Sequence, residues 1–455
     1  MIHKNTFATQ QNMTFLQFPL SYCIYKYYEH LHMKKALILS FFLLTFISCS
    51  KEQSSLIMNY SEESYTIPLS TAIESLNDVL NGLNSVPGTK CATPDTRFSI
   101  DVFGGLSITS TKAIGLDLSI PDTLMYLVNF DDTQGGFAVL AGDSRLGESV
   151  YCVTESGNID VEDFAQAFDF LHSRTTKAND IDSDSFIDIG PKFVPALLLS
   201  SMLADLKYGS VLETETKSSA ITTSSVLLKT KWTQSSPFNT YTFDDDGVRS
   251  PVGCVALACA QIMQYCQQPA NPTFDGVSCS WDDMGTVYSS DHIDDQHCTE
   301  SAKEQVARFL KHIGQRSLCN IRYAPDGSTG YAAGVVRTLE YYDYRDVKKR
   351  TGFGSTNQSK ASAMLAQKKP VYLDGSDYHN GGGHAWVIDG EWNGYFHCNW
   401  GWGGAADGFY AKHNYFPISS RAYYEQGTDP GTSISDASTT NYDWNFRIVT
   451  YSYTK

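Results

Sequence analysis

The chain has 455 residues, of which 42% are hydrophobic and 13% aromatic, and its formal net charge is -16. This composition supplies enough apolar side chains for sizeable cores and excludes a largely disordered chain. An acidic chain repels phosphate backbones, so we expect no nucleic acid among its partners. The length predicts two domains behind a targeting segment.

Residues 33–49 have the features of a signal peptide. Met33-Lys34-Lys35 gives a basic start, an apolar stretch follows, and Cys49 stands directly after a small residue. The apolar stretch has the length of a signal core and is too short to cross a membrane. Cys49 resembles the lipid-bearing cysteine of a lipoprotein signal, which predicts an outer-membrane lipoprotein. The alternative is an ordinary secretory signal and a released protein. Because a basic start belongs at an N-terminus, residues 1–32 are interpreted as an artefact of start assignment.

Residues 50–222 are predicted to form one α+β unit. The apolar spacing predicts helices and strands in the following order: a helix near Leu69–Leu83, strands Met125–Phe130, Phe137–Ala141 and Val150–Thr154, and a helix over Val161–Leu171. Between Thr214 and Ser225 the sequence becomes rich in Ser, Thr and Lys, which is typical of an exposed linker open to proteolysis. We therefore place the boundary to a second domain, residues 223–455, in this segment.

The second domain contains a candidate nucleophile. Cys254 follows Gly253 and opens an apolar run with helical spacing, and Pro251 precedes it. A helix N-terminus favours a thiolate, and its free N–H groups can bind an oxyanion. The alternative is a small buried cysteine with a structural role only.

A candidate general base lies later in the chain. His384 follows three glycines and opens a strand, Ala385–Asp389, and an Asn-Gly turn separates it from a return strand, Tyr395–Trp400. For a loop of two to five residues, paired positions sum to about 784–787. His384 is then close to Asn399, which can accept a hydrogen bond from one ring nitrogen while the other faces the thiol. His397 is a less favoured candidate for the base.

The eleven cysteines form no Cys-x-x-Cys pair and no even framework. We therefore expect no metal site, no other cofactor and few or no disulfides.

Taken together, these stretches resemble the streptopain family of secreted, papain-like cysteine proteases over roughly residues 120–450. The runs that carry the resemblance are Trp232–Asn239, Val252–Ala256, Gly382–Gly390 and Asn399–Gly404, together with Gly135–Asp143, which is similar to that family's propeptide.

The resemblance implies an α+β, papain-like catalytic domain of two subdomains, preceded by a separate α+β inhibitory pro-domain over residues 50–222. It also implies substrate-backbone contacts near Ser328 and Gly383. The sequence departs from the family at Asp374, where a neutral residue is expected, and it lacks the papain signature around the cysteine.

The predicted function is that of a cysteine endopeptidase made as a zymogen, acting on proteins or peptides and inhibited by its own pro-domain. Cys254 attacks the carbonyl, and His384 protonates the leaving amine and then activates water. The Cys254 N–H and the Gln234 side chain bind the oxyanion, Asn399 orients His384, and Trp400 shields that contact from water. Two alternatives are a cysteine amidase or peptidoglycan peptidase, and a non-catalytic binding or inhibitor module on the same fold.

Overall fold

The structure is a computed structural model in which the described residues belong to one compact unit, Ser64–Lys455. The described ranges are 65–108, 118–131, 135–172, 186–209, 222–287, 298–377, 381–415 and 444–453. The predicted signal peptide, residues 33–49, the segment 1–32 and most of the predicted linker lie outside the described residues.

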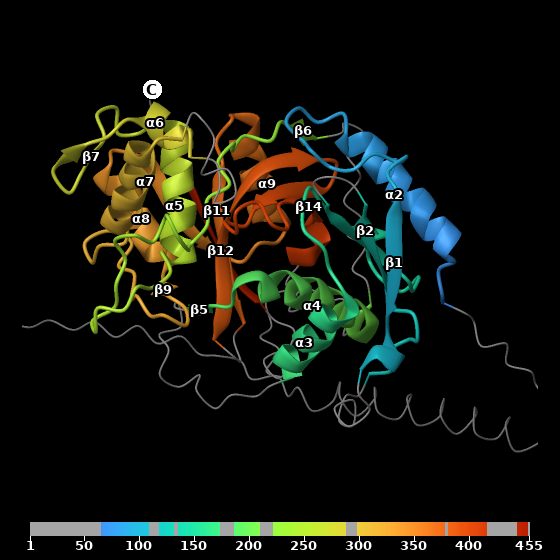
Figure 1. Cartoon of the computed structure of the whole chain (residues 1–455). Helices are drawn as coiled ribbons and strands as arrows, with labels where there is room; N and C mark the ends of the chain where they lie inside the picture. Colours follow the sequence, from blue (N-terminus) through green and yellow to red (C-terminus); the bar gives the residue numbers. More distant parts are fainter. Residues whose placement is uncertain are drawn as a thin grey trace, which may run out of the picture. The chain divides into compact units, whose positions relative to one another are not determined.

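One 13-stranded sheet passes through the described part of the molecule, with a main path of β1-β2-β3-β4-β14-β13-β12-β11-β15-β10. The first four of these strands come from the predicted pro-domain and the others from the predicted catalytic domain (Figure 1). The two groups join where β4 pairs antiparallel with β14, for example Thr154 with Gly408. The α+β class is confirmed, but the sequence did not predict that a single sheet would continue across the domain boundary.

In the first half of the described chain, residues 65–222, the predicted helices and strands are confirmed. The elements of residues 65–222 are α2 (Leu69–Leu83), β1 (Phe98–Phe103), β2 (Met125–Phe130), β3 (Phe137–Ala141), β4 (Val150–Thr154), α3 (Val161–His172), β5 (Phe186–Asp188) and α4 (Phe193–Tyr208). The short strand β6 (Thr223–Ser224) begins the second half. The sequence analysis did not predict β1, β5 or α4. Helix α4 is apolar around most of its circumference, so it lacks the one-sided periodicity that reveals a surface helix.

The second half combines a helical part with the rest of the sheet. The helical part contains α5 (Cys254–Cys266), α6 (Trp281–Gly285), α7 (Glu300–Ile313) and α8 (Ala332–Tyr341), with the short strands β7 (Thr273–Phe274), β8 (Val277–Ser278) and β9 (Thr329–Gly330). The sheet part contains β10 (Arg345–Thr351), α9 (Ser355–Ala366), β11 (Val371–Asp377), β12 (Gly382–Trp392), β13 (Tyr395–Asn399), β14 (Gly408–Ala411) and β15 (Trp444–Ser452).

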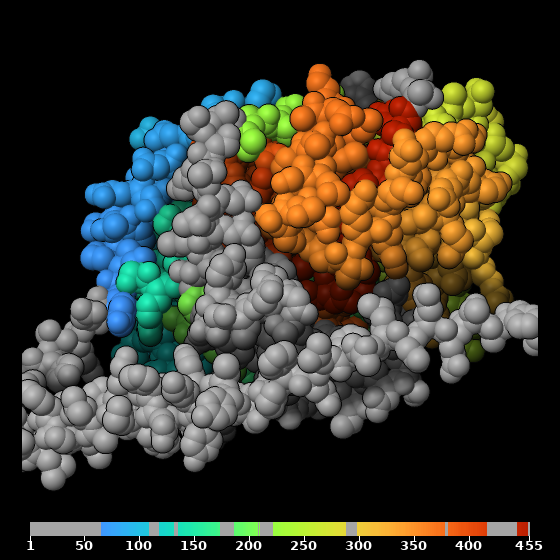
Figure 2. Space-filling model, turned by 180° about the vertical axis from the view of Figure 1, so that it is seen from behind, coloured from blue at the N-terminus to red at the C-terminus, as the bar shows by residue number. Residues whose placement is uncertain are grey.

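Helix α5 lies against the sheet at β12 and β11, so the nucleophile helix and the strand with the candidate base are direct neighbours (Figure 1). Seen from behind, the blue residues at the start of the first half, which include α2, and the yellow residues of the helical part lie on opposite sides of the view (Figure 2). One hydrophobic core extends from α3 and α4 through β12 to α5 and α7, and a second core lies between α2 and the sheet. The helices and the sheet that position the site therefore share one continuous interior.

The β12–β13 hairpin has the predicted register. Val387 pairs with Asn399 and Ile388 with Cys398, and after an irregularity Gly390 pairs with His397. The Asn-Gly turn at Asn393-Gly394 has both residues at positive φ, as a tight hairpin turn requires. Among the described residues, no helix is both long and apolar enough to cross a membrane.

Candidate active site

Cys254 is the first residue of α5, as the sequence predicts. Gly253 immediately before it has a φ of 88°, a conformation that favours glycine. A Cβ on Gly253 would also lie 3.0 Å from Ile321. The hydroxyl of Ser328 donates to the Pro251 carbonyl at 2.7 Å and ties this turn to the loop before β9. The thiol is therefore held at the helix N-terminus, and Cys254 is 2% exposed.

His384 lies on β12 and is fully buried. One of its ring nitrogens, the Cys254 sulfur and a carboxylate oxygen of Asp188 lie within 4.8 Å of one another. The structure therefore brings the predicted nucleophile and the predicted base into one site. It also adds a third group, Asp188, that the sequence analysis did not identify.

Asp188 is the last residue of β5, which comes from the predicted pro-domain. Its carboxylate accepts a hydrogen bond from His384 Nδ1 at 2.8 Å and one from Gln234 Nε2 at 2.5 Å. The backbone N–H of Gly190 donates to the same side chain at 2.8 Å and fixes its orientation. The Cys254 sulfur lies within 4.8 Å of the Asp188 carboxylate oxygen. A carboxylate of the first half thus binds the predicted base and oxyanion donor and lies beside the predicted nucleophile.

The partners of His384 define its protonation state. Nδ1 faces the Asp188 carboxylate, and Nε2 faces the Trp400 carbonyl at 2.8 Å. A carbonyl and an ionised carboxylate can only accept, so both ring nitrogens donate and the ring is an imidazolium. Burial raises the pKa of Asp188, but the charge of His384 and the hydrogen bonds from His384 and Gln234 outweigh it and lower the pKa.

The surroundings of the Cys254 thiol favour its uncharged form, in contrast to those of the His384 ring. Burial, followed by the nearby charge of Asp188, raises the pKa of Cys254 well above its usual value. A cysteine protease requires a thiolate that is stabilised by an imidazolium. The Asp188 carboxylate is therefore the anion beside His384, and the raised pKa favours the neutral form of the Cys254 thiol.

The predicted hydrogen bond between His384 and Asn399 is not formed, and this expectation is wrong for the state described. Asn399 Oδ1 accepts from Gln261 on α5 at 2.9 Å, and its Nδ2 donates to the Thr230 carbonyl at 2.9 Å. The Asn399 side chain therefore faces α5 and the segment before it. The Trp400 carbonyl, one residue further along the chain, is the acceptor that holds His384 Nε2.

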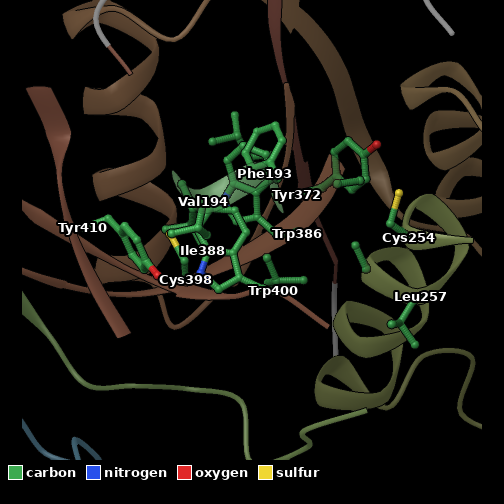
Figure 3. Packing of buried hydrophobic residues seen from close by; sticks show 14 of the residues in the cluster. Phe193, Val194, Cys254, Leu257, Tyr372, Trp386, Ile388, Cys398, Trp400 and Tyr410 are labelled. Carbon is green, nitrogen blue, oxygen red and sulfur yellow. The ribbon is translucent and has the colours of Figure 1, made fainter. Parts of the chain in front are cut away.

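Aromatic rings surround the imidazole. Trp402 is nearest, with its ring centroid 4.6 Å from that of His384, whereas Trp400 is at 6.1 Å. Phe193 at the start of α4 contacts the same group, with centroids 5.8 Å from His384 and 5.2 Å from Trp386. Figure 3 shows Phe193 packed against Trp386, with Trp400 beside them. Trp400 packs among these rings, but the contact between His384 and Asn399 that it was expected to shield is not formed.

The two predicted substrate-contact residues both lie beside the strand that carries Asp188. Gly383 on β12 pairs with Asp188 in parallel register. Ser328 directly precedes β9, which pairs antiparallel with β5 through Thr329 and Ile187. The strand β5 therefore occupies the position between the two segments that were predicted to bind a substrate backbone.

Two other residues singled out in the sequence have structural partners. Asp374 on β11 is fully buried, accepts from Arg447 Nε at 2.6 Å, and also accepts from the Tyr372 hydroxyl at 2.7 Å. His397 Nδ1 lies 2.6 Å from Asp389.

His397 also links the two halves of the chain. Its Nε2 lies 3.6 Å from Glu155, a residue of the first half, and Glu155 is 3.8 Å from Lys231. Burial lowers the pKa of His397, but Asp389 and Glu155 outweigh it and raise the pKa to about 10. A raised pKa favours the charged ring at pH 7, which has no free lone pair to accept a proton, so His397 is assigned to an ionic contact between the two halves.

Asp188, Cys254 and His384 are also the one group of potential metal ligands found among the described residues. Carboxylate, thiolate and imidazole are all ligands that Zn²⁺ accepts. Here both imidazole nitrogens are already engaged and the thiol is protonated, so the arrangement is that of an ion pair.

Residues 232–410 match the family model of the peptidase C10 family. Over these residues the chain is similar to that family, and the match supports a streptopain-like cysteine protease. The matched range contains Gln234, Cys254, His384 and Asn399, whereas Asp188 lies before it.

Named relatives agree with this similarity. The chain is 25% identical over 330 residues to streptopain of Streptococcus pyogenes serotype M28, covering 63% of this chain and 73% of streptopain. It is 31% identical over 196 residues to the thiol protease/hemagglutinin PrtT of Porphyromonas gingivalis, covering 39% of this chain and 22% of PrtT. These findings show a streptopain-like cysteine endopeptidase that is made as a zymogen.

Two solved structures of Prevotella intermedia are also similar. A prointerpain A fragment is 22% identical, with a TM-score of 0.46, and the match covers 72% of this chain and 96% of the fragment. Active interpain A is 22% identical, with a TM-score of 0.36, and the match covers 51% of this chain and 96% of that protein.

Proposed function

We propose that Cys254 and His384 are the catalytic pair of this peptidase and that Asp188 keeps the precursor inactive. The observation that supports this proposal is the position of the Asp188 carboxylate, which accepts from His384 and Gln234 and lies within 4.8 Å of the Cys254 sulfur. A buried carboxylate placed among three catalytic groups blocks the substrate carbonyl and stabilises the neutral thiol.

Removal of Asp188 leaves the imidazolium without its anion. The Cys254 sulfur is then the nearest group that can supply a negative charge, and the N-terminus of α5 stabilises a thiolate there. The thiolate attacks the peptide carbonyl carbon, and His384 gives its proton to the leaving amine as the acyl-enzyme forms. The neutral imidazole next removes a proton from water, which attacks the thioester and restores Cys254.

Gln234 is the side-chain donor for the oxyanion. Its Nε2 already donates to a carboxylate oxygen in the precursor, so it points at the position that a tetrahedral oxygen would occupy. The backbone N–H of Cys254 is the second donor at the helix N-terminus. We assign substrate-backbone contacts to Gly383 and to the segment beginning at Ser328, because both flank β5.

The Trp400 carbonyl orients His384, and Asn399 acts through it. Asn399 Oδ1 also accepts from the Gly401 N–H at 3.2 Å, so this amide fixes the chain on both sides of Trp400. Through Gln261 the same side chain connects the end of β13 to α5. Asn399 is therefore a positioning residue that aligns the base-bearing strand with the nucleophile helix.

The proposed pro-domain spans residues 50–222 and the catalytic domain residues 223–455. Activation requires a cut between about Lys217 and Ser225 and release of the first half. The cut alone leaves β5 hydrogen-bonded on both of its edges and β4 paired with β14. The contact of Glu155 with His397 and Lys231 also remains after the cut. Dissociation of these contacts is therefore a separate step of activation.

We further propose that the protein is exported by the signal peptide at residues 33–49. A lipid on Cys49 would anchor it to the outer membrane, whereas cleavage without lipidation would release it. The mass of the mature N-terminus distinguishes these two fates.

The test of the proposed function compares three preparations: the intact precursor, the form cut near residue 220 with its first half removed, and that form carrying Cys254→Ala. Hydrolysis of casein by the cut form alone supports an endopeptidase. Hydrolysis of a peptidoglycan fragment with casein left intact would favour the amidase alternative. Cys279→Ala is the matched control because Cys279 is the partly exposed cysteine among those described. Equal hydrolysis by the Cys254→Ala form would overturn the assignment.

A further inference from the structure

The connection between β13 and β14, residues 400–407, carries groups that lie next to the proposed base, and we call it the Trp400 loop. Its first residue supplies the carbonyl that lies 2.8 Å from His384 Nε2, and the Trp402 ring centroid lies 4.6 Å from that of the imidazole. Every residue has a backbone carbonyl, so what matters here is its position. The orientation of His384 therefore depends on the contacts that hold the chain at Trp400.

The Trp400 carbonyl also decides which ring nitrogen of His384 carries the proton when the imidazole is neutral. A carbonyl oxygen can only accept a hydrogen bond, so the hydrogen stays on Nε2 and the lone pair is on Nδ1. In the precursor Nδ1 lies 2.8 Å from Asp188. Once Asp188 has left, Nδ1 is free to remove a proton from water. The reaction therefore requires the Trp400 carbonyl to stay in one place.

The side chain that holds Trp400 belongs to the last residue of the same loop. Asp407 Oδ1 accepts a hydrogen bond from the Trp400 N–H at 2.9 Å and so joins the two ends of the loop. Asp407 is 1% exposed and Trp400 is fully buried, so water has little access to this N–H. A buried N–H without an acceptor is costly. Removal of the Asp407 carboxyl is therefore expected to displace the chain at Trp400.

In the precursor the first half of the chain also holds the Trp400 loop. The Glu155 N–H donates to the Asp407 carbonyl at 2.7 Å. The Ser156 hydroxyl donates to the Gly404 carbonyl at 2.5 Å. Both of these hydrogen bonds are lost when the first half is released, whereas the bond between Asp407 and Trp400 lies wholly within the catalytic half. The loop therefore depends more on the Asp407 side chain in the mature enzyme than in the precursor.

The Asp407 carboxyl serves as an acceptor rather than as a fixed charge. Burial raises its pKa to about 7, although the charge of Lys231 and the hydrogen bond from Trp400 act in the opposite direction. A carboxyl group retains an acceptor oxygen whether or not it is ionised. An asparagine side chain of the same shape can therefore supply the oxygen that Trp400 needs, whereas an apolar side chain cannot.

We propose that Asp407 is a positioning residue for the catalytic base: it fixes the Trp400 backbone, and the Trp400 carbonyl in turn fixes His384. The inference rests on the proposed function, since it concerns the base of the same reaction. Asp407 complements Asn399, which accepts from the Gly401 N–H at 3.2 Å on the other side of Trp400. One side chain thus holds the N–H before the carbonyl, and the other holds the N–H after it.

Two substitutions at Asp407 separate the acceptor oxygen from the shape of the side chain. Asp407→Asn keeps an acceptor, and Asp407→Leu keeps the branched shape without one. Both variants are folded as full-length precursors, in which the first half supports the loop, and are then cut and separated. We expect Asp407→Asn to retain kcat within about threefold and Asp407→Leu to lose about 10²-fold in kcat with little change in KM, as a displacement of about 1 Å at a catalytic group can cost. Equal kcat values in the two variants, or a loss confined to KM, would overturn the proposal.

The pH dependence of Cys254 alkylation in the mature enzyme separates a positioning role from a general loss of structure. The Trp400 carbonyl stabilises the imidazolium of His384, and the imidazolium stabilises the thiolate, so loss of that contact makes the thiolate form only at higher pH. The other charged group near the thiol, Asp374, is the same in both variants. We expect the midpoint of alkylation by iodoacetamide to rise in Asp407→Leu and to stay at the wild-type pH in Asp407→Asn. Partial unfolding would reduce the amount of folded enzyme without moving this midpoint. An unchanged midpoint in Asp407→Leu would contradict the proposal.

Failure of this inference is distinguishable from failure of the proposed function. If Cys254→Ala is inactive and Asp407→Leu is as active as the wild type, the role of Asp407 is wrong and the catalytic assignment stands. If Cys254→Ala hydrolyses the substrate as well as the wild type, the catalytic assignment fails. If Asp407→Leu does not stay folded after the cut, Asp407→Asn still decides the question. Retained kcat in Asp407→Asn supports the acceptor role, and a kcat lowered as far as that expected for Asp407→Leu overturns it.

Discussion

Replacement of Asp188 by asparagine isolates the charge that keeps the precursor inactive. Asparagine has nearly the same size and shape, so the fold of β5 and its pairing on both edges are retained. The amide carries no negative charge, and its NH₂ group would face the donors on His384 or Gln234. The variant therefore loses the anion beside the imidazolium and at least one of these hydrogen bonds.

The size of the effect follows from the contacts that are lost. A hydrogen bond to a charged group contributes about 1.5–3 kcal/mol, and removal of one partner of a buried ion pair costs about 3–5 kcal/mol. The Asp188 side chain is 5% exposed, so solvent screens these contacts little. We take the lower end of the ion-pair range, about 3 kcal/mol. The fraction of precursor molecules in which residue 188 has left the Cys254–His384 site then rises roughly 100-fold, since about 1.4 kcal/mol is a factor of ten.

The assay is alkylation of Cys254 by iodoacetamide in uncut precursor, with the rate followed by peptide mass spectrometry from pH 5 to 9. We expect Asp188→Asn to raise the rate about 100-fold at pH 7 and to shift the pH midpoint downward. The shift follows because the negative charge of Asp188 is one cause of the raised pKa of the thiol.

Asp205→Asn is the matched control for this experiment. Asp205 is also a buried pro-domain aspartate that accepts from a histidine, His413, at 2.9 Å. Its other hydrogen bonds come from the Tyr151 hydroxyl and the Gly147 N–H rather than from catalytic groups. Equal alkylation rates in wild type and Asp188→Asn, or equal acceleration by Asp205→Asn, would refute the role assigned to Asp188.

Three further predictions concern pH, the ionic contact between the halves and the oxyanion. The pKa values of Asp188 and Glu155 are lowered because His384 and His397 outweigh burial, so these carboxylates stabilise the precursor above the usual carboxyl pKa of about 4, and this stabilisation is lost as pH falls through the lowered values. Precursor that is held briefly at about pH 2–3 and assayed directly after return to about pH 7 should therefore show faster alkylation of Cys254, and an unchanged rate would contradict this. Glu155→Gln should accelerate dissociation of the first half after the cut, as measured by size-exclusion chromatography, whereas unchanged dissociation would show that the contact with His397 does not retain it. Gln234→Ala should lower kcat of the mature enzyme about 10²–10³-fold with little change in KM, and a change confined to KM would remove Gln234 from the oxyanion site.

The catalytic half was largely predictable because its signals are local. The Gly253-Cys254 pair before an apolar periodic run identifies the start of α5. The Asn393-Gly394 turn sets the register of β12 and β13 to within one residue, which places His384 near Trp400. Turn chemistry and helix capping depend on neighbouring residues, so the sequence alone contains the required information.

The inhibitory contact was not predictable in the same way. Asp188 meets His384 across a separation of 196 residues, and β5 contains three residues, so neither periodicity nor length distinguishes it. The acceptor for His384 Nε2 is a backbone carbonyl, which every residue has, so sequence reasoning selected the Asn399 side chain instead. Helix α4 was missed because it is apolar on nearly all sides.

The most direct test of the account is modification of the precursor and of the separated mature form with an epoxide inhibitor of thiol proteases, read by mass spectrometry for every cysteine. The account predicts stoichiometric modification of Cys254 in the mature form, with loss of activity, and protection of Cys254 in the precursor while partly exposed Cys279 reacts equally in both. Modification of Cys254 at the same rate in both forms, or full activity after its modification, would contradict the account.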